Sequence, residues 1–125
     1  MGNKVLVVED YDDSRAFIKF LLETYGFDVL EATNGYEAVE AVRKQAPDLV
    51  LMDISMPVMD GLTATKEIRA HEKNGVKVPI VALTAQSEGV RTSAFEAGID
   101  ALLSKPLDFD DLKPVLVRYL SRALP

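Results

Sequence analysis

Residues 47–61, PDLVLMDISMPVMDG, are the stretch that decides the fold of this chain. The four apolar residues at 49–52 are typical of a short strand that is buried on both faces, as in a parallel sheet. The strand runs into Asp53, which then stands at the carboxyl end of a central strand, where open α/β sheets bind ligands. Pro57 and the pair Asp60-Gly61 predict a shaped loop before the next helix. A single acid in this place is also compatible with a helix-capping or turn aspartate.

The composition is that of one acidic domain. A length of 125 residues predicts a single domain, residues 1–125, that can bury a core without disulfides. The chain has no cysteine, which excludes thiolate chemistry, and no apolar run that approaches a membrane span. Its formal charge of −6 argues against DNA binding by this domain, because such binding relies on Lys and Arg. Since no charged and apolar leader is present, we expect a cytoplasmic location without membrane contact.

Strand and helix patterns alternate along the chain, with no linker or repeat between them. The predicted strands cover residues 4–8, 27–31, 49–52, 78–83 and 99–103. The predicted helices run from a cap at Asp12 or Asp13 to Gly26, from Asn34-Gly35 to just before Pro47, from Leu62 to Asn74-Gly75, and over 87–97 and 110–122. Single helices between strands make the neighbours parallel, with right-handed crossovers. The pattern predicts an α/β fold: a doubly wound five-stranded parallel sheet, flavodoxin-like order 2-1-3-4-5, with helices on both faces.

Apolar residues at helical spacing predict the apolar face of two helices. In the first helix they are Phe17, Phe20, Leu21 and Tyr25, and in the last they are Phe109, Leu112, Val115, Leu116 and Tyr119. The one histidine, His71, lies in a charged stretch and is expected on the surface.

Polar residues follow four of the predicted strands at the point where each strand ends. They are Glu9 and Asp10 after the first strand, Asp53 after the third, Thr84 after the fourth and Lys105 after the fifth. In the order 2-1-3-4-5 the carboxyl ends of these strands meet at one edge, so the three acids crowd together. Carboxylates at close range repel one another, and Mg²⁺ relieves this because it accepts oxygen ligands. The alternative is a set of solvated acids with raised pKa values and no metal.

The predicted site suits phosphoryl transfer better than nucleotide binding. No glycine-rich turn follows the first strand, so the backbone cradle of nucleotide-binding folds is missing. A Mg²⁺ ion with one lysine and one hydroxyl can instead stabilise the oxygens of a transferring phosphoryl group. A carboxylate can act as the nucleophile, and Asp53 is the best placed because it is single and central.

With these residues, the chain resembles the receiver domain of two-component response regulators. In length it resembles the single-domain, chemotaxis-type members of that family. The resemblance covers essentially the whole chain and depends on a set of motifs. They are Glu9-Asp10, Asp53 followed by Met56-Pro57 and Met59-Asp60-Gly61, Thr84-Ala85, and Lys105-Pro106. The resemblance implies that Asp53 accepts a phosphoryl group from a histidine kinase or a histidine phosphotransfer protein, in a reaction that requires Mg²⁺.

The resemblance also implies a role for each site residue. Asp10 and Asp53 would coordinate Mg²⁺ together with the backbone carbonyl of Ser55, and Glu9 would assist through water. The remaining roles concern the phosphoryl group: Thr84 would donate a hydrogen bond to it, Ala85 would leave room for its access, and Lys105 would pair with one of its oxygens. In such domains the peptide between Lys105 and Pro106 is often cis.

Two positions differ from the pattern that is frequent in this family. The position three before Lys105 is often a switch aromatic and is Leu102 here, so a ring rotation cannot report phosphorylation. Signalling is therefore predicted to run through Thr84 and the loop to Glu88, toward the fourth helix, the fifth strand and the fifth helix. The residue two after Asp53 is the small, uncharged Ser55, which leaves the lifetime of the phosphorylated state open.

The sequence predicts a phosphorylation-controlled signalling switch. Such a domain catalyses its own aspartyl phosphorylation and slow dephosphorylation but does not mainly turn over an external substrate. The competing hypothesis is a phosphatase of the haloacid dehalogenase type, which needs a second aspartate where Ser55 stands and usually a cap insertion. A non-phosphorylated adaptor is a third interpretation. The cognate kinase, the output protein and the oligomeric state stay open, as does the choice among a free-standing regulator, a phosphorelay intermediate and part of a hybrid kinase.

Overall fold

The computed structural model describes residues 3–56, 58–73, 75–85 and 89–120, and it contains one five-stranded parallel sheet. The strands are β1 (Lys4–Val8), β2 (Asp28–Ala32), β3 (Leu49–Asp53), β4 (Ile80–Thr84) and β5 (Ala101–Ser104). Their order is β2-β1-β3-β4-β5, which confirms the predicted order. This order puts β1 and β4 on either side of β3, the strand that ends at Asp53.

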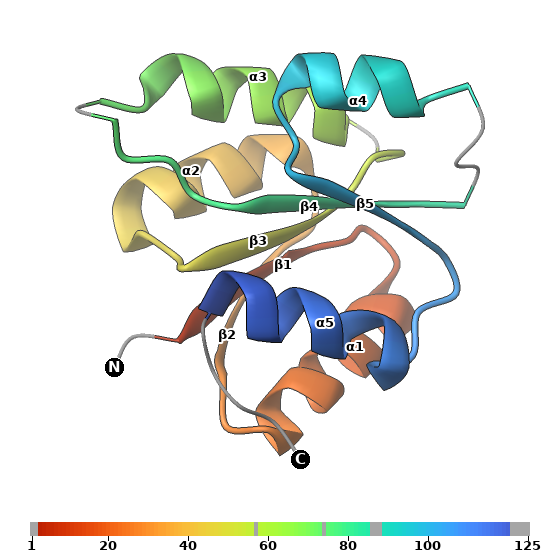
Figure 1. The fold of residues 1–125 in the computed structure, drawn as a ribbon. Helices are drawn as coiled ribbons and strands as arrows, with labels where there is room; N and C mark the ends of the chain where they lie inside the picture. The colour runs from red at the N-terminus through yellow and green to blue at the C-terminus, as the bar shows by residue number, and fades with distance from the viewer. Residues whose placement is uncertain (1–2, 57, 74, 86–88, 121–125) are drawn as a thin grey trace.

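Within the described part of the chain, five helices cover the two faces of the sheet. They are α1 (Asp12–Thr24), α2 (Gly35–Gln45), α3 (Gly61–His71), α4 (Arg91–Ala97) and α5 (Phe109–Leu120). Helices α2, α3 and α4 lie on one face, and α1 and α5 lie on the other (Figure 1). The predicted doubly wound architecture is therefore confirmed. In the described ranges, no helix has both the length and the apolar character needed to cross a membrane.

The sheet separates two apolar layers. Successive residues of β1 alternate between them: Val5 and Val7 pack with α1 and α5, whereas Leu6 and Val8 pack with α2, α3 and α4. All five residues of β3 and all five of β4 are buried. Burial on both faces explains why these strands are nearly continuous apolar runs in the sequence.

Local sequence signals account for several helix ends. The Asn34 side chain accepts a hydrogen bond from the Glu37 amide at the start of α2, and Asp60 caps α3 in the same way. Gly26 and Gly98 have positive φ angles just past α1 and α4, as such a helix ending requires. The prediction that Asp12 or Asp13 caps α1 is wrong, because the cap residue is Tyr11, which makes no side-chain capping bond.

Several predicted boundaries are shifted, and β4 and β5 show why. Strand β4 begins at Ile80 instead of Val78, because the Val78 amide donates to Glu72 and its carbonyl accepts from Arg69, so neither joins the sheet. Strand β5 begins at Ala101, since the Ile99 amide donates to a carbonyl of α4. Strand β2 is shifted by one residue and β3 includes the acid that follows the predicted run. Helix α3 ends three residues early and α4 starts at residue 91; the predicted positions 74, 87, 121 and 122 lie outside the described residues.

The prediction for the apolar face of α1 is partly wrong. Phe17 and Phe20 are 49% and 66% exposed, and the residues of α1 that are buried are Ile18 and Leu22. In α5, by contrast, the predicted positions at 112, 115 and 116 are buried, and 109 and 119 pack against the same layer. His71 is exposed, as predicted.

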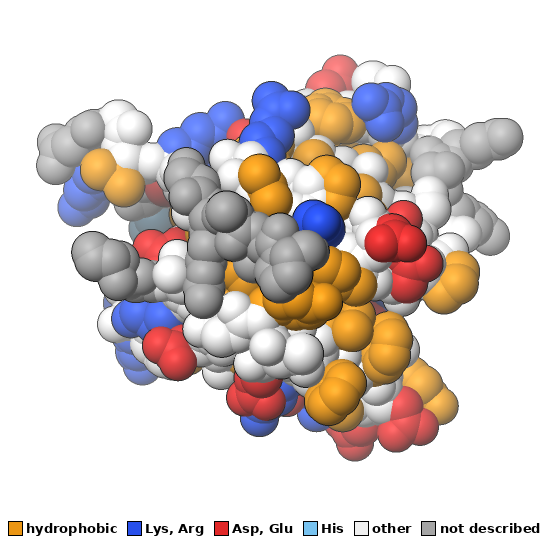
Figure 2. Space-filling view, turned by 60° about the horizontal axis from the view of Figure 1, so that its bottom comes forward, with side chains coloured by type: hydrophobic (Ala, Val, Ile, Leu, Met, Phe, Trp, Pro, Cys, Tyr) orange, Lys and Arg blue, Asp and Glu red, His pale blue; other side chains and the backbone are white. Residues whose placement is uncertain are grey.

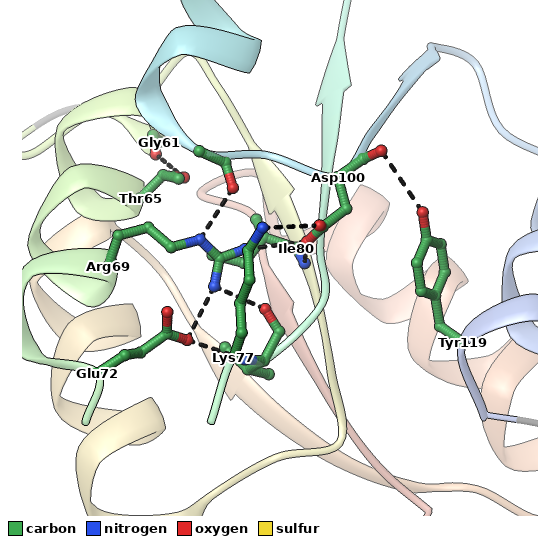
Figure 3. A network of polar contacts seen from close by, with 10 residues as sticks. Gly61, Thr65, Arg69, Glu72, Lys77, Ile80, Asp100 and Tyr119 are labelled. Atoms are coloured by element: carbon green, nitrogen blue, oxygen red, sulfur yellow. Dashed lines mark hydrogen bonds and ion pairs between the residues drawn. The ribbon is translucent and has the colours of Figure 1, made fainter. Parts of the chain in front are cut away.

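Arg69 of α3 joins three elements at the amino-terminal edge of the sheet (Figure 3). Its guanidinium donates to the carbonyls of Gly98 and Val78, at 2.9 and 2.8 Å, and to the carboxylate of Asp100, at 2.9 Å. The same Asp100 oxygen accepts the amide of Ile80 at 2.8 Å. Arg69 thereby fixes the end of α4 and the starts of β4 and β5 relative to α3.

Candidate functional site

The carboxyl edge of the sheet brings four of the predicted site residues together. Glu9 directly follows β1, Asp53 and Thr84 end β3 and β4, and Lys105 directly follows β5. The Lys105 amide donates to the Thr84 carbonyl at 2.8 Å, which extends the pairing of β4 with β5 to the site. Parallel pairing in register thus places side chains that are up to 96 residues apart in sequence around one point.

Three carboxylates form a cluster that could hold a metal ion. One oxygen each from Glu9, Asp10 and Asp53 lies within 4.8 Å of the others. Glu9 and Asp53 are 1% and 4% exposed, whereas Asp10 is exposed. In an octahedral Mg²⁺ site with bonds of about 2.1 Å, opposite ligands lie about 4.2 Å apart. The chemistry and spacing of this donor set therefore fit Mg²⁺ after small side-chain adjustments.

Lys105 is the counter-charge of the two buried acids. Its Nζ lies 2.6 Å from Oε1 of Glu9 and 2.9 Å from Oδ2 of Asp53. Burial lowers the pKa of Lys105, but the hydrogen bonds to Asp53 and Glu9 together outweigh burial, so its pKa is raised and the ammonium stays charged. The sequence predicted Lys105 at this edge but not its bond to Glu9. The peptide between Lys105 and Pro106 is cis.

The backbone around Asp53 is closely packed. The Ser55 amide donates to Oδ1 of Asp53 at 3.1 Å, and the Gly61 amide donates to the Ile54 carbonyl at 2.9 Å. A Cβ atom at Gly61 would lie 2.2 Å from the Asp53 carbonyl oxygen, which no side chain can tolerate. The start of α3 is thus pressed against the strand end that carries Asp53. The sequence identified Gly61 as part of a turn and of a family motif, but not its contact with β3, because a close approach of two backbone segments leaves no local signal.

Besides the bond from Lys105, three hydrogen bonds hold Glu9. Its amide donates to the Ala32 carbonyl of β2 at 3.1 Å, and its carboxylate accepts the Tyr11 amide, also at 3.1 Å. Its carbonyl accepts Nη1 of Arg15 at 2.9 Å. Sequence analysis did not identify Arg15. A basic residue early in a helix that follows two acids is the one signal that could have indicated it.

A cavity of about 420 Å³ opens beside the cluster toward α1. Its lining consists of Glu9, Ser14, Phe17, Ile18, Ala85, Lys105, Pro106 and Leu107. The space-filling view that brings the α1 and α5 side forward shows hydrophobic side chains gathered on this face (Figure 2). The exposed apolar residues at 11, 17 and 20 belong to α1 and the residue before it. An apolar surface therefore borders the way into the site.

The two predicted switch positions lie on the β4–β5 side of the site. Thr84 is buried at the end of β4. Leu102 of β5 is partly buried and packs against the apolar layer that contains α2, α3 and α4. Ala85 is exposed, while the loop positions 86–88 on the predicted signalling path lie outside the described residues.

The chain is similar in sequence to receiver domains and to parts of histidine kinases. The family model described as response regulator receiver domain matches residues 5–116. The chain is 41% identical to the sensor protein GacS of Pseudomonas syringae pv. syringae over 124 residues, which is 97% of the chain and 14% of GacS. It is 43% identical to the hybrid signal transduction histidine kinase G of Dictyostelium discoideum over 93% of the chain and 4% of that kinase. The chain thus corresponds to a small part of these relatives.

Solved structures resemble the chain over nearly its full length. The receiver domain of sensor histidine kinase PA1611 from Pseudomonas aeruginosa PAO1 has a TM-score of 0.88 and 37% identity, with 98% of this chain and 100% of that chain covered. That structure holds a magnesium ion in the active-site cleft. A chain from the co-crystal structure of Saccharomyces cerevisiae Ypd1, a histidine phosphotransfer protein, with the Ssk1 receiver domain has a TM-score of 0.85 and 28% identity. There the coverage is 94% of this chain and 88% of that chain.

Proposed function

The chain belongs to the response regulator receiver domains, and on that basis we propose that it is a phosphorylation-controlled switch in a two-component system or phosphorelay. The observation that carries the proposal is the contact of Lys105 with Asp53 inside a cluster of three carboxylates. In this function the domain, residues 1–125, catalyses its own phosphorylation and slow dephosphorylation, and it changes its affinity for an output protein in between. The function implies a cytoplasmic location.

Asp53 is the proposed phosphoryl acceptor. A carboxylate oxygen of Asp53 forms a bond to phosphorus while the bond between phosphorus and the donor's histidine nitrogen breaks, and the departing imidazole takes up a proton. Among the three acids, Asp53 is the one at the end of the central strand, and its Oδ2 already lies against the ammonium of Lys105. Slow attack of water on the new acyl phosphate would return the free carboxylate.

The metal ligands are proposed as Asp10, Asp53 and the backbone carbonyl of Ser55, with Glu9 acting through water. The fit of the carboxylate cluster to Mg²⁺ supports this assignment, as does the magnesium ion in the similar PA1611 receiver domain. When bound, the ion supplies positive charge that reduces repulsion between the carboxylate and the incoming phosphoryl group.

Two further residues are proposed to contact the phosphoryl group, and a third to leave room for it. Lys105 gives up one of its carboxylate partners and pairs with a phosphoryl oxygen, which a raised pKa and a permanent charge favour. The hydroxyl of Thr84 donates a hydrogen bond from the end of the neighbouring strand. Ala85 is small and lines the cavity, so it leaves the entrance open.

The donor is proposed to be a histidine kinase or a histidine phosphotransfer protein that docks on the apolar surface of α1. Phe17 lines the cavity beside Lys105, and Phe20 lies on the next turn of the same helix with two thirds of its surface exposed. A partner that covers this surface brings its phosphohistidine to the site and excludes water. Ypd1, a phosphotransfer protein, was co-crystallised with a receiver domain, which supports this class of donor.

The function is tested by comparing two small phosphoryl compounds in the presence of Mg²⁺. Phosphoramidate has the same nitrogen–phosphorus bond as phosphohistidine, so the wild type should gain the mass of one phosphoryl group, and base should remove it, as expected for an acyl phosphate. With p-nitrophenyl phosphate, a phosphatase substrate, release of p-nitrophenol should not rise above the protein-free control. Rapid, catalytic release of p-nitrophenol without phosphorylation from phosphoramidate would support the phosphatase hypothesis instead.

The output signal is proposed to pass through Thr84 to α4, β5 and α5. A phosphoryl group adds close to two negative charges and strong acceptor oxygens, which attract the Thr84 hydroxyl. Because Leu102 has no ring to rotate, the element with two states is the segment after Thr84 together with α4. The first turn of α4 has no side-chain cap, whereas Arg69 holds Gly98, the residue directly after α4, so the start of α4 is the easier end to move.

Amide hydrogen exchange with and without beryllofluoride, a phosphoryl mimic, checks this route. The largest change should fall between Thr84 and Leu103, and Thr84→Ala should at least halve it while leaving the phosphorylation of Asp53 by phosphoramidate intact. A change that centres on α1, or that survives Thr84→Ala at full size, would show that the signal takes another path.

A further inference from the structure

Arg15 makes three hydrogen bonds, of which two join α1 to the strand ends and one stays within α1. Its Nη1 donates to the Glu9 carbonyl at 2.9 Å, its Nε to Glu31 of β2 at 3.1 Å, and its Nη2 to Asp12 at 2.7 Å. The side chain is only 15% exposed. Arginine presents its donors in a planar, fixed arrangement, so binding at two sites determines where the third donor points.

The bond from Arg15 to the Glu9 carbonyl acts on a peptide unit that matters for metal binding. This carbonyl belongs to the planar peptide that joins Glu9 to Asp10. Because the peptide is planar, a hydrogen bond that holds its oxygen also fixes the position of the Asp10 Cα. On the other side of Glu9, the amide is held by Ala32 of β2. The Asp10 side chain is exposed and has no hydrogen-bond partner among the described residues, so the position of its backbone sets where its carboxylate can reach.

We propose that Arg15 is a positioning residue of the metal site: by holding the Glu9–Asp10 peptide, it aims the Asp10 carboxylate at the point where Glu9 and Asp53 converge. The proposal rests on the proposed function only in assuming that the cluster binds Mg²⁺. Arg15 contacts neither the ion nor the phosphoryl group.

Glu31, the residue of β2 that anchors Arg15, has a second basic partner. Glu31 also accepts Nζ of Lys19 at 3.1 Å. The hydrogen bond from Lys19 first, and then that from Arg15, outweigh burial and lower the pKa of Glu31, so this carboxylate stays ionised. Lys19 therefore shares the anchor and the charge of Arg15, but only Arg15 reaches Glu9. This makes Lys19 a matched control.

The sign of the effect separates positioning from simple electrostatics. Arg15 is a cation near the cluster, so its removal would strengthen Mg²⁺ binding if charge alone mattered. If Arg15 positions Asp10, its removal weakens binding, because partners that orient metal ligands typically contribute tenfold to hundredfold in affinity. Calorimetric titration with MgCl₂ should therefore give about tenfold weaker binding for Arg15→Met. Lys19→Met should bind as tightly as the wild type or slightly more tightly.

Two further variants complete the test. Asp10→Ala should lose Mg²⁺ binding, and a wild type that fails to bind Mg²⁺ would overturn the metal site itself. If the wild type binds and Arg15→Met binds equally tightly or more tightly, the role of Arg15 is wrong while the proposed function stands. Should Arg15→Met fail to fold, Arg15→Lys decides, because it keeps the positive charge and removes the planar set of donors that reaches Glu9 and Glu31 together. A several-fold loss of affinity in Arg15→Lys supports positioning, and an unchanged affinity overturns it.

Discussion

Asp53→Asn is expected to abolish phosphorylation completely, both by phosphoramidate and by a histidine phosphotransfer protein that phosphorylates the wild type. The amide has nearly the same shape as the carboxylate but lacks a nucleophilic oxygen, so the chemistry is lost while the packing at the end of β3 is retained. Intact-protein mass spectrometry in Mg²⁺ checks this. Labelling of Asp53→Asn at the wild-type rate would show that another residue is the acceptor.

Phe20→Glu is the complementary variant: it should impair transfer from the protein donor and leave the reaction with phosphoramidate unchanged. Phe20 is 66% exposed on α1 and is not among the residues that form the carboxylate cluster or the cavity, so its replacement should leave the fold and the reaction with phosphoramidate unchanged. Transfer from the phosphotransfer protein should fall at least about tenfold, because buried aromatic anchors dominate interface energies. An unchanged rate from the protein donor would place the docking surface elsewhere and leave the role of Asp53 intact.

Gly61→Ala is expected to be strongly destabilising and to impair the site from a residue that never touches the phosphoryl group. Its Cβ would lie 2.2 Å from the Asp53 carbonyl oxygen and 2.9 Å from the Ile54 Cα, and both are backbone atoms that cannot rotate away. Separating α3 from β3 by most of an ångström should cost about 3 kcal/mol of unfolding free energy. Chemical denaturation measures this cost, and the phosphorylation rate should fall with it.

Gly75→Ala separates crowding from backbone conformation. Gly75 has a φ of +72° and nothing within 4 Å of an added Cβ, so its replacement carries only the cost of the left-handed conformation, about 1 kcal/mol. If Gly61→Ala is no more destabilising than Gly75→Ala, the packing of α3 against the end of β3 is looser than the 2.2 Å contact indicates.

The fold and the position of the site could be predicted because both follow from strand ends. The strands are recognisable in the sequence as apolar runs. Single helices between them make the strands parallel, and the carboxyl ends of parallel strands lie at one edge of the sheet. Given the strand order, the acids after β1 and β3 and the lysine after β5 must meet, as they do. The prediction needed no knowledge of side-chain contacts.

The features that sequence analysis missed depend on tertiary contacts. Helical spacing marks α1 as amphipathic, but Phe17 and Phe20 are as apolar as Ile18 and Leu22, and only docking on the sheet decides which pair is buried. The contact of Arg15 with the Glu9 carbonyl is equally hidden, since a backbone acceptor has no signature in the sequence.

The division of the core into two layers has a consequence for how such a domain can diversify. Val5 and Val7 belong to the layer under α1 and α5, and Leu6 and Val8 to the layer under α2, α3 and α4, with the sheet between them. Substitutions in separate layers share few neighbours, so their effects on the free energy of unfolding are additive, without an extra term from contact between the two sites. Donor choice, assigned to α1, could drift on one side of the sheet without forcing α3 or α4 to repack. A gene-duplicated copy could thus acquire a new upstream partner while its downstream contacts through α4 stay unchanged; contacts through α5 are excepted, because α5 shares the layer of α1.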